Sequence, residues 1–151
     1  MRFRKGVFIL LYSIDKEKIN YLILKRKLHW KGWEFNKGGL KKKEKILDAI
    51  KREIKEETKT LKLLKIKKFP YTGKYRYKKE LPDRENFIGQ TFSLYAVEVK
   101  NKKIKVDGFE HSKAIWTDYK TALKKLTWPN QRKSLRIVNS YLKNEIQRKR
   151  T

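Results

Sequence analysis

The stretch Gly38-Gly39-Leu40-Lys41-Lys42-Lys43-Glu44, together with Lys45–Leu61 that follows it, decides how this chain is interpreted. The glycine pair ends an extended segment, and the residues after it have the period of an amphipathic helix. At 100° per residue, a stripe about 100° wide collects the apolar side chains. These are Ile46, Leu47, Ile50 and Ile54. We expect this stripe to face the core.

Three carboxylates crowd the same helix in Arg52-Glu53-Ile54-Lys55-Glu56-Glu57. Glu53 and Glu57 project at the edge of the apolar stripe, and Glu56 lies about one step further round. Like charges at this spacing repel, more strongly where they are partly desolvated. Hard divalent cations such as Mg²⁺ or Mn²⁺ require oxygen ligands of this kind. The alternative is a surface helix whose lysines neutralise the repulsion.

The spacing resembles the Nudix hydrolase box: Gly38, five residues, Glu44, seven residues, then Arg52 to Glu57. The box closes with a glycine where this chain has Lys59, which tolerates a left-handed backbone less readily. The resemblance implies an α/β/α sandwich with a mixed β-sheet between helices. The metal ligands that it implies are the Gly38 carbonyl, Glu53, Glu56 and Glu57. Glu44 and Arg52 are then organisers, with Arg52 able to pair with Glu56.

The implied activity is hydrolysis of a phosphoanhydride bond in a nucleoside diphosphate linked to another group, with Mg²⁺ or Mn²⁺ as cofactor. The general base must be a carboxylate that reaches the attacking water. In the family it is a box glutamate, which here would be Glu53, or a glutamate on a later loop. Glu110 is the best later candidate, and a surface role is its alternative. His111 is expected at the surface, since nothing else is arranged for imidazole chemistry.

Residues Trp33-Glu34-Phe35-Asn36-Lys37-Gly38 are similar to the lead-in of many Nudix enzymes, with Asn36 in place of a proline. By that resemblance Lys37 contacts a phosphate, whereas Trp33 is expected in the core. Recognition of a base needs an aromatic face or a guanidinium plane. The candidates, each of which could instead be a core or rim residue, are Trp128 with the nearby Arg132, and then Tyr95.

Two sets of short resemblances indicate different substrates. Leu81-Pro82 and Ile88-Gly89-Gln90 are similar to bacterial RNA pyrophosphohydrolases, whereas Glu110-His111, Trp116 and Ala122-Leu123 are similar to asymmetric dinucleoside tetraphosphatases. We expect a dinucleoside tetraphosphate as the preferred substrate, with a 5′-triphosphate or capped RNA end close behind. The rival class is a nucleic-acid-binding protein without turnover. The retained carboxylates argue against it, since negative charge beside a phosphate would not help a binder.

The remaining elements follow from hydrophobic periodicity and turn residues. Strands are expected over Val7–Ile14, Tyr21–Arg26, Leu61–Tyr71, Phe87–Val99 and Ala114–Trp116, the last at an edge. Helices are expected over Tyr119–Leu126 and Asn130–Ile146. Thr72–Glu85 is expected to be a loop or ragged hairpin, and Gln147–Thr151 a solvated tail. Phe92, Leu94 and Ala96 should be buried and Thr91, Ser93 and Tyr95 half-exposed.

Composition limits the remaining possibilities. The 151 residues fit one domain spanning 1–151, and 42 Lys+Arg against 16 Asp+Glu give a net charge of +26. Such a charge attracts polyanions, including nucleotides and RNA, unless the lysine reflects codon bias or a thermophilic composition. The absence of cysteine excludes disulfides and thiolate metal sites. The longest apolar run, Val7–Tyr12, is too short to span a membrane, so we expect an intracellular, cytoplasmic protein. The oligomeric state is not predicted.

Overall fold

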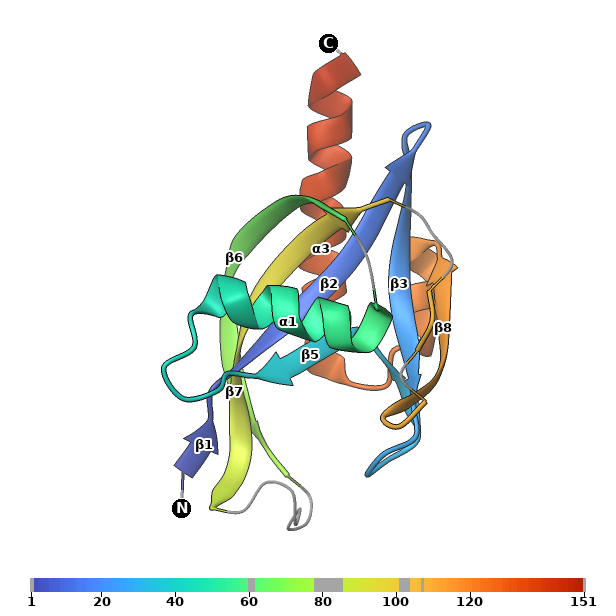
Figure 1. Ribbon diagram of the computed structural model, residues 1–151. Coiled ribbons are helices and arrows are strands. Elements are labelled where there is room, and N and C mark those ends of the chain that lie inside the picture. The colour runs from blue at the N-terminus through green and yellow to red at the C-terminus, as the bar shows by residue number, and fades with distance from the viewer. Residues whose placement is uncertain (1, 60–61, 78–85, 101–103, 107, 151) are drawn as a thin grey trace.

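A mixed β-sheet lies between helices in the computed structural model, which describes residues 2–59, 62–77, 86–100, 104–106 and 108–150 (Figure 1). Its strands are β1 (Arg2–Arg4), β2 (Gly6–Asp15), β3 (Lys18–Arg26), β4 (Gly32–Glu34), β5 (Asn36–Gly39), β6 (Leu63–Arg76), β7 (Phe87–Val99) and β8 (His111–Thr117). Its helices are α1 (Ile46–Thr58), α2 (Tyr119–Lys125) and α3 (Pro129–Arg150).

Strand β2 organises the sheet. It runs parallel to β7 and antiparallel to β3 and β5. Strand β6 continues the sheet beyond β7, and β4 and β8 both pair antiparallel with β3. Because β5 pairs with β2, the backbone of Asn36–Gly39 is fixed beside the N-terminal half of the central strand.

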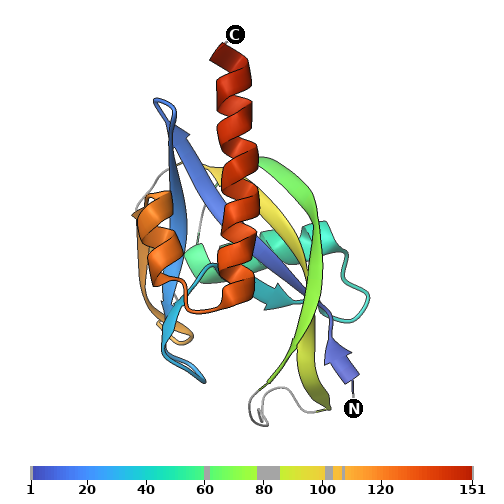
Figure 2. The same cartoon turned by 180° about the vertical axis from the view of Figure 1, so that it is seen from behind.

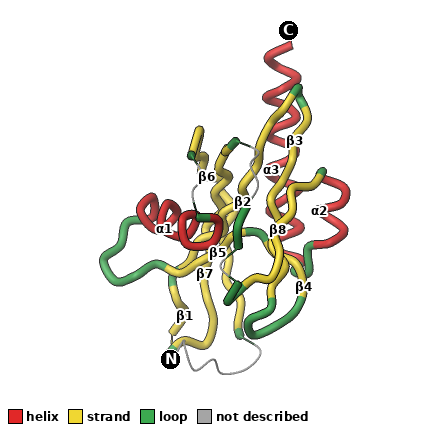
Figure 3. The backbone as a smooth tube through the Cα atoms, turned by 45° about the vertical axis from the view of Figure 1, so that its right-hand side comes forward, coloured by secondary structure: helices red, strands yellow, loops and turns green. Residues whose placement is uncertain are grey.

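Each face of the sheet has its own apolar cluster, because the side chains of β2 alternate between the faces. Phe8, Leu10 and Tyr12 join the cluster under α2 and α3, whereas Val7, Ile9 and Leu11 join the cluster under α1. Figures 2 and 3 show α3 crossing one face of the sheet and α1 lying on the other. The expected α/β/α sandwich is therefore confirmed. Burial on both faces explains the nearly continuous apolar run of β2.

Two expectations about burial were wrong. Leu47 is 53% exposed, although its angular position matches the stripe of α1. The helical period places a side chain around the axis, but it does not say how far along the axis the neighbouring sheet extends. Tyr95 is only 7% exposed and packs in the cluster under α1, since both faces of β7 are covered at this point.

Two element boundaries also differ from expectation. Strand β6 continues through Thr72–Arg76, paired with Ser93–Gly89 of β7, which agrees with the ragged hairpin and not with the loop expected there. Helix α3 continues to Arg150, so Gln147–Arg150 is helical rather than a tail. The expected Leu81-Pro82 motif lies outside the described residues, as do Leu61 and most of the Thr72–Glu85 loop. No helix among the described residues is long and apolar enough to cross a membrane.

The C-terminal end of α1 shows the effect of the missing box glycine. The helix ends at Thr58, and Lys59 adopts φ 70°, with its N–H donating to the Lys55 carbonyl at 2.9 Å. Positive φ is costly for a residue with a Cβ atom. Lys59 therefore takes a backbone conformation better suited to glycine.

Candidate active site

Two carboxylates of α1 are buried beside strand β5. Glu53 is 9% exposed and Glu57 is 4% exposed, whereas 54% of the Glu56 side chain is exposed. Gly38 lies so close to Glu53 that an added Cβ atom would come within 2.2 Å of the Glu53 Cδ atom. Glycine at this position therefore has a steric cause. It lets the β5 backbone and the Glu53 carboxylate approach each other.

Arg52 ties the loop before α1 to the helix. Its guanidinium donates two hydrogen bonds of 2.8 Å to Glu44 and one of 2.9 Å to the Gly39 carbonyl. It also donates to Glu53 at 2.8 Å, and reaches Glu56 at 3.4 Å. The hydrogen bonds from Arg52 and from the Lys41 backbone lower the pKa of Glu44 to about 2. These contacts agree with the organising role expected of Arg52 and Glu44.

Asn36 orients Glu57. The Asn36 Nδ2 group donates to Glu57 Oε2 at 2.6 Å, and both residues are buried. The Asn36 Oδ1 atom is buried without a hydrogen-bond partner among the described residues. Because a proline cannot donate this bond, the departure from the family's lead-in adds a contact to the site. It fixes one oxygen of Glu57 and leaves the other for a ligand.

The α1 carboxylates lack enough positive charge around them. Burial raises the pKa of Glu53 to about 7, against the opposing effect of Arg52. Burial also raises the pKa of Glu57 well above its usual range, and the carboxylates of Glu53, Glu34 and Glu110 add to this effect. A bound cation would reverse both shifts, because it stabilises the charged form of each carboxyl group.

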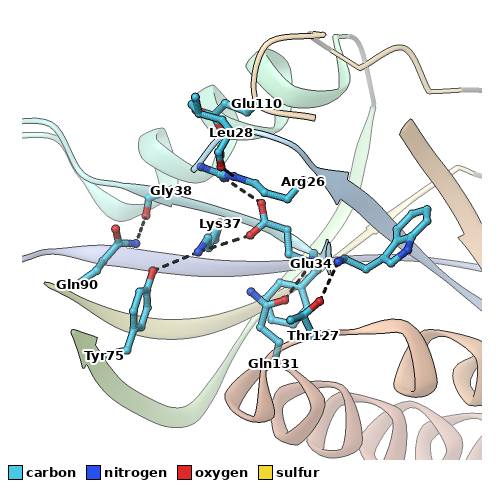
Figure 4. Close-up of polar contacts among 12 residues, drawn as sticks. Arg26, Leu28, Glu34, Lys37, Gly38, Tyr75, Gln90, Glu110, Thr127 and Gln131 are labelled. Atoms are coloured by element: carbon cyan, nitrogen blue, oxygen red, sulfur yellow. Dashed lines mark hydrogen bonds and ion pairs between the residues drawn. The ribbon is translucent and has the colours of Figure 1, made fainter. Parts of the chain in front are cut away.

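A third buried carboxylate, Glu34 on β4, has the opposite environment (Figure 4). The Arg26 Nη1 atom lies 3.0 Å from Glu34 Oε2, and the Lys37 Nζ atom lies 3.5 Å from Oε1. The His111 Nε2 atom lies 2.7 Å from Oε2. Although burial opposes ionisation, Lys37, His111 and Arg26 lower the pKa of Glu34 to about 2. Since the carboxylate is ionised, His111 Nε2 is the donor.

The structure corrects the expectation for His111, which is 1% exposed rather than at the surface. It is the first residue of β8, and β8 pairs with β3 so that His111 lies opposite Arg26. Its ring therefore meets Glu34 from the neighbouring strand β4. The imidazole holds a buried network together.

Glu110 lies between the two groups of charges. Its carbonyl accepts hydrogen bonds from the Lys27 and Leu28 N–H groups at 2.9 and 3.3 Å, which fixes its backbone to the end of β3. Its side chain is 35% exposed and lies 3.5 Å from Arg26 Nη1. One ligand atom each of Glu57, Glu110 and His111 lies within 4.8 Å of the others. Glu110 is thus near α1, as a later-loop base would be.

Lys37 is held among aromatic rings. Its Nζ atom lies 5.2 Å from the centre of the Tyr75 ring and 5.9 Å from the Trp30 ring, and donates to the Tyr75 hydroxyl at 3.4 Å. Trp30 meets Trp128 edge to face at 5.0 Å. Trp128, expected to stack on a base, is therefore in the same neighbourhood as Lys37.

The other two base-binding candidates are less suited to that role. Tyr95 is buried in the cluster under α1, which leaves little ring surface for a base. Arg132 uses Nη1 to donate to the Leu126 and Thr127 carbonyls at 2.7 and 2.9 Å. The end of α2 thus occupies part of its guanidinium. Trp33 is partly buried and packs against the cluster under α2 and α3.

The oxygens of Glu53, Glu57 and the Gly38 carbonyl suit a divalent cation. Carboxylate and carbonyl oxygens are the ligands that Mg²⁺ and Mn²⁺ prefer. The Gly38 carbonyl accepts from Gln90 Nε2 at 3.3 Å, and a carbonyl oxygen has a second lone pair (Figure 4). The buried carboxylates also need positive charge. The expected ligand set thus fits the residues present, and Glu56 lies at its exposed side.

Five residues of the site were not predicted from the sequence to be functional: Arg26, Glu34, Asn36, Gln90 and His111. The available signals were polar residues within otherwise buried segments, such as Arg26 at the end of an apolar strand and Glu34 between Trp33 and Phe35. Strands β4 and β5 are held in place from α3, where Gln131 Oε1 accepts from the Phe35 N–H at 3.2 Å (Figure 4).

Comparison with known proteins gives one domain match, to the NUDIX domain, over residues 2–137. An RNA pyrophosphohydrolase from a Nitratiruptor species is 33% identical over 122 residues, which are 79% of this chain and 77% of that protein.

Two solved structures have the same fold. A candidate NUDIX hydrolase from Listeria monocytogenes has a TM-score of 0.73 at 21% identity, over 96% of this chain and 97% of that one. An Ap4A hydrolase from C. elegans has a TM-score of 0.72 at 20% identity, over 92% of this chain and 97% of that one. Identities this low speak for the fold alone.

Proposed function

This chain belongs to the Nudix family and is a Nudix pyrophosphohydrolase, and we propose that its substrate is the 5′-triphosphate end of RNA. The observation that carries the proposal is the 33% identity to an RNA pyrophosphohydrolase across most of both chains. The net charge of +26 supports it, because a long polyanion gains more from such a charge than a small nucleotide does. This order reverses the preference expected from the sequence.

The reaction is attack of water on a phosphorus atom of the 5′-triphosphate. The bond to the leaving phosphate oxygen breaks, and the products are a 5′-monophosphorylated RNA and pyrophosphate, or two phosphates after stepwise cleavage. Divalent cations, when bound, supply positive charge to the phosphate oxygens. Glu53, Glu57 and the Gly38 carbonyl would hold them, with Glu56 at the exposed side. Asn36, Arg52 and Glu44 keep these groups in place.

Glu110 is the base in this proposal. It is the later-loop carboxylate, and it lies near Glu57. Its side chain is partly exposed, so it can accept a proton from the attacking water and pass that proton to solvent. The Arg26 Nη1 atom, 3.5 Å away, helps to hold the carboxylate at this position. Glu53 remains the alternative base within the box.

Lys37 and the surrounding rings form the proposed substrate side. The Lys37 ammonium can neutralise a phosphate, and Trp128 and Trp30 offer ring surface for the first base. A dinucleoside tetraphosphate is the second candidate substrate, favoured by the residues Glu110-His111 and Trp116. It would use the same cleavage chemistry.

The test is a substrate panel with Mg²⁺ and with Mn²⁺: triphosphorylated RNA, capped RNA, a dinucleoside tetraphosphate and a nucleoside triphosphate. Products are identified by mass. We expect the highest kcat/KM for triphosphorylated RNA. A higher value for the dinucleoside tetraphosphate would restore the order expected from the sequence. No turnover of any compound would favour a binding protein.

A further inference from the structure

Three lysine–tyrosine pairs lie in a row along strand β6, starting at the candidate active site. The Nζ atom of Lys37 lies 5.2 Å from the centre of the Tyr75 ring, and that of Lys133 lies 5.0 Å from the Tyr71 ring. The Nζ atom of Lys67 lies 4.8 Å from the Tyr141 ring. We call these six residues the lysine–tyrosine row. Each pair joins β6 to another element: β5 at Lys37, and α3 at Lys133 and Tyr141.

The pairing of β6 with β7 puts this row on one face of the sheet. Opposite residues on paired strands share a face. Lys67 lies opposite Ala96, and Tyr75 lies opposite Gln90, two residues before Phe92. Ala96 and Phe92 belong to the apolar cluster under α2 and α3. The Tyr71 ring contacts Phe92 at 5.3 Å, so it also faces this side despite the bulge between Phe69 and Thr72.

The row lies at an edge rather than within the core. Among the described residues, β6 pairs with β7 alone, and α3 lies beside it on the same face (Figure 2). The three tyrosines are partly buried: their rings pack against the apolar cluster. Lys133 is exposed and Lys67 is partly buried, so both ammonium groups can meet an anion from solvent.

We propose that the lysine–tyrosine row binds the single-stranded RNA that follows the 5′ end in the active site. Proteins that bind single strands combine a positive track for the phosphates with aromatic rings for the bases. The row offers lysines for the phosphates, each over a tyrosine ring, and its first pair contains the lysine placed beside the site. This inference rests on the proposed RNA substrate and adds where the rest of that substrate lies.

The geometry suits a strand rather than a small ligand. Tyr75 and Lys67 are eight residues apart along β6, which is about 26 Å at the rise of a strand. A dinucleoside tetraphosphate needs only the end at Lys37. The lysines of the row lie on the face of the sheet under α2 and α3, whereas Lys51 and Lys55 belong to α1 on the other face.

The test compares two double variants with the same change in net charge. The variant Lys67→Gln/Lys133→Gln removes two charges from the row, and Lys51→Gln/Lys55→Gln removes two from α1. Binding of a 20-nucleotide RNA with a 5′-hydroxyl is measured by fluorescence anisotropy at several salt concentrations. Turnover of triphosphorylated RNAs of 2 and 20 nucleotides is measured in parallel.

We expect the row variant to bind the 20-nucleotide RNA about tenfold more weakly at low salt. Its log–log salt slope should be smaller by roughly 1.4, since each lost phosphate contact contributes about 0.7 for a single strand. Its kcat/KM should fall to a similar extent for the 20-nucleotide substrate and stay within about twofold for the dinucleotide. The α1 variant should lose less than half as much in each measurement.

Equal losses in the two variants would overturn the inference, because the whole charge and not the row would then attract RNA. Unchanged binding in the row variant would overturn it as well and leave the lysines as covers for tyrosine rings. A failure of the proposed function would be recognised separately, because the wild-type protein would then not hydrolyse even the triphosphorylated dinucleotide. Binding of the 5′-hydroxyl RNA decides the row in either case.

Discussion

Two groups of buried carboxylates lie close together in this protein and differ in how their charge is balanced. Glu34 on β4 is met by Arg26, His111 and Lys37, and its pKa falls to about 2. Glu53 and Glu57 on α1 are buried with too little positive charge, and their pKa values rise. In the first group three cationic or donor side chains surround the Glu34 charge, although its buried Oε1 atom has no hydrogen-bond partner among the described residues, and we interpret this group as structural. The second is not balanced in this way, which supports the proposal that it takes up a cation from outside.

Glu110 lies near both groups, and replacing it tests whether it acts with the α1 carboxylates or with the Glu34 group. We expect Glu110→Gln to lower kcat by about 10²–10⁴, the usual cost of losing a general base. Mn²⁺ affinity and the free energy of unfolding should change little, because the Arg26 contact at 3.5 Å is long and partly exposed. Single-turnover kinetics with a triphosphorylated RNA gives the rate. A decrease of less than tenfold would assign the base role to Glu53.

Replacing Glu34 should weaken the fold instead. Glu34→Gln leaves Arg26 and Lys37 without their buried counter-charge, and breaking one side of a buried ion pair typically costs about 3–5 kcal/mol. Urea denaturation measures this change. Glu145→Gln is the matched control, since Glu145 pairs with Arg148 at the surface and should change stability by less than about 1 kcal/mol. Equal stability of the two variants would contradict the structural role of Glu34.

Replacing Asn36, a neutral residue that donates a hydrogen bond to Glu57, tests the α1 group. Asn36→Leu keeps the shape of the side chain but removes the hydrogen bond to Glu57, and the loss of such a supporting contact typically weakens metal binding about 10–100-fold. Isothermal titration with Mn²⁺ measures this. Asn139→Leu, which removes a buried amide bonded to the Tyr21 hydroxyl, is the control and should keep the wild-type affinity. Similar affinities in both variants would remove Asn36 from the site.

The smallest effect concerns the end of α1, away from both charge groups. Lys59→Gly should raise the free energy of unfolding by about 1 kcal/mol or less, because glycine adopts the positive φ of this position without steric cost. The larger chain entropy of glycine in the unfolded state reduces the gain. Thermal denaturation at fixed metal concentration measures the shift. A loss of stability would mean that the Lys59 side chain stabilises the fold.

The two groups also differ in how far the sequence predicts them. Gly38, Glu44, Arg52, Glu53 and Glu57 lie within one continuous strand–loop–helix segment, so their spacing largely determines their relative positions. Arg26, Glu34 and His111 come from three strands. They meet only because β4 and β8 both pair with β3, and no local period encodes that pairing. Nothing near His111 in the sequence indicates a partner for its imidazole, and the surface position predicted for it is therefore wrong.

In the fold, the predictions that were right depend on local sequence, and those that were wrong depend on contacts between distant segments. Strands β2, β3 and β7 are predicted by their apolar periods, and the sandwich by the family resemblance. The burial of Tyr95 depends on a helix that covers the second face of β7, and the exposure of Leu47 depends on where the sheet ends. Both are properties of packing between distant segments.

The raised pKa values of the α1 carboxylates give the stability of the metal-free protein a defined dependence on pH. Since Glu53 has a raised pKa of about 7 against an ordinary value of 4.5, the folded state binds more protons than the unfolded state between these values. The contribution of Glu53 to the stability of the metal-free protein should therefore be fully present below about pH 4.5 and be lost as the pH rises to 7. Glu34 and Glu44, whose pKa is lowered to about 2, act in the opposite direction below pH 4.5. At 1.36 kcal/mol per pKa unit, the raised pKa of Glu53 alone accounts for a loss of stability on the order of 3 kcal/mol over this pH range. Glu57 shifts in the same direction.

The most direct measurement is the free energy of unfolding of the wild type and of Glu57→Gln from pH 5 to 7.5, with and without Mn²⁺. The wild type should lose stability with rising pH and regain about 2.7 kcal/mol at a Mn²⁺ concentration a hundred times its Kd. Glu57→Gln should be more stable than the wild type without metal at pH 7.5, gain little from Mn²⁺ and hydrolyse RNA ends poorly. A variant that binds Mn²⁺ as the wild type does and retains turnover would contradict the assignment of α1 as the metal site.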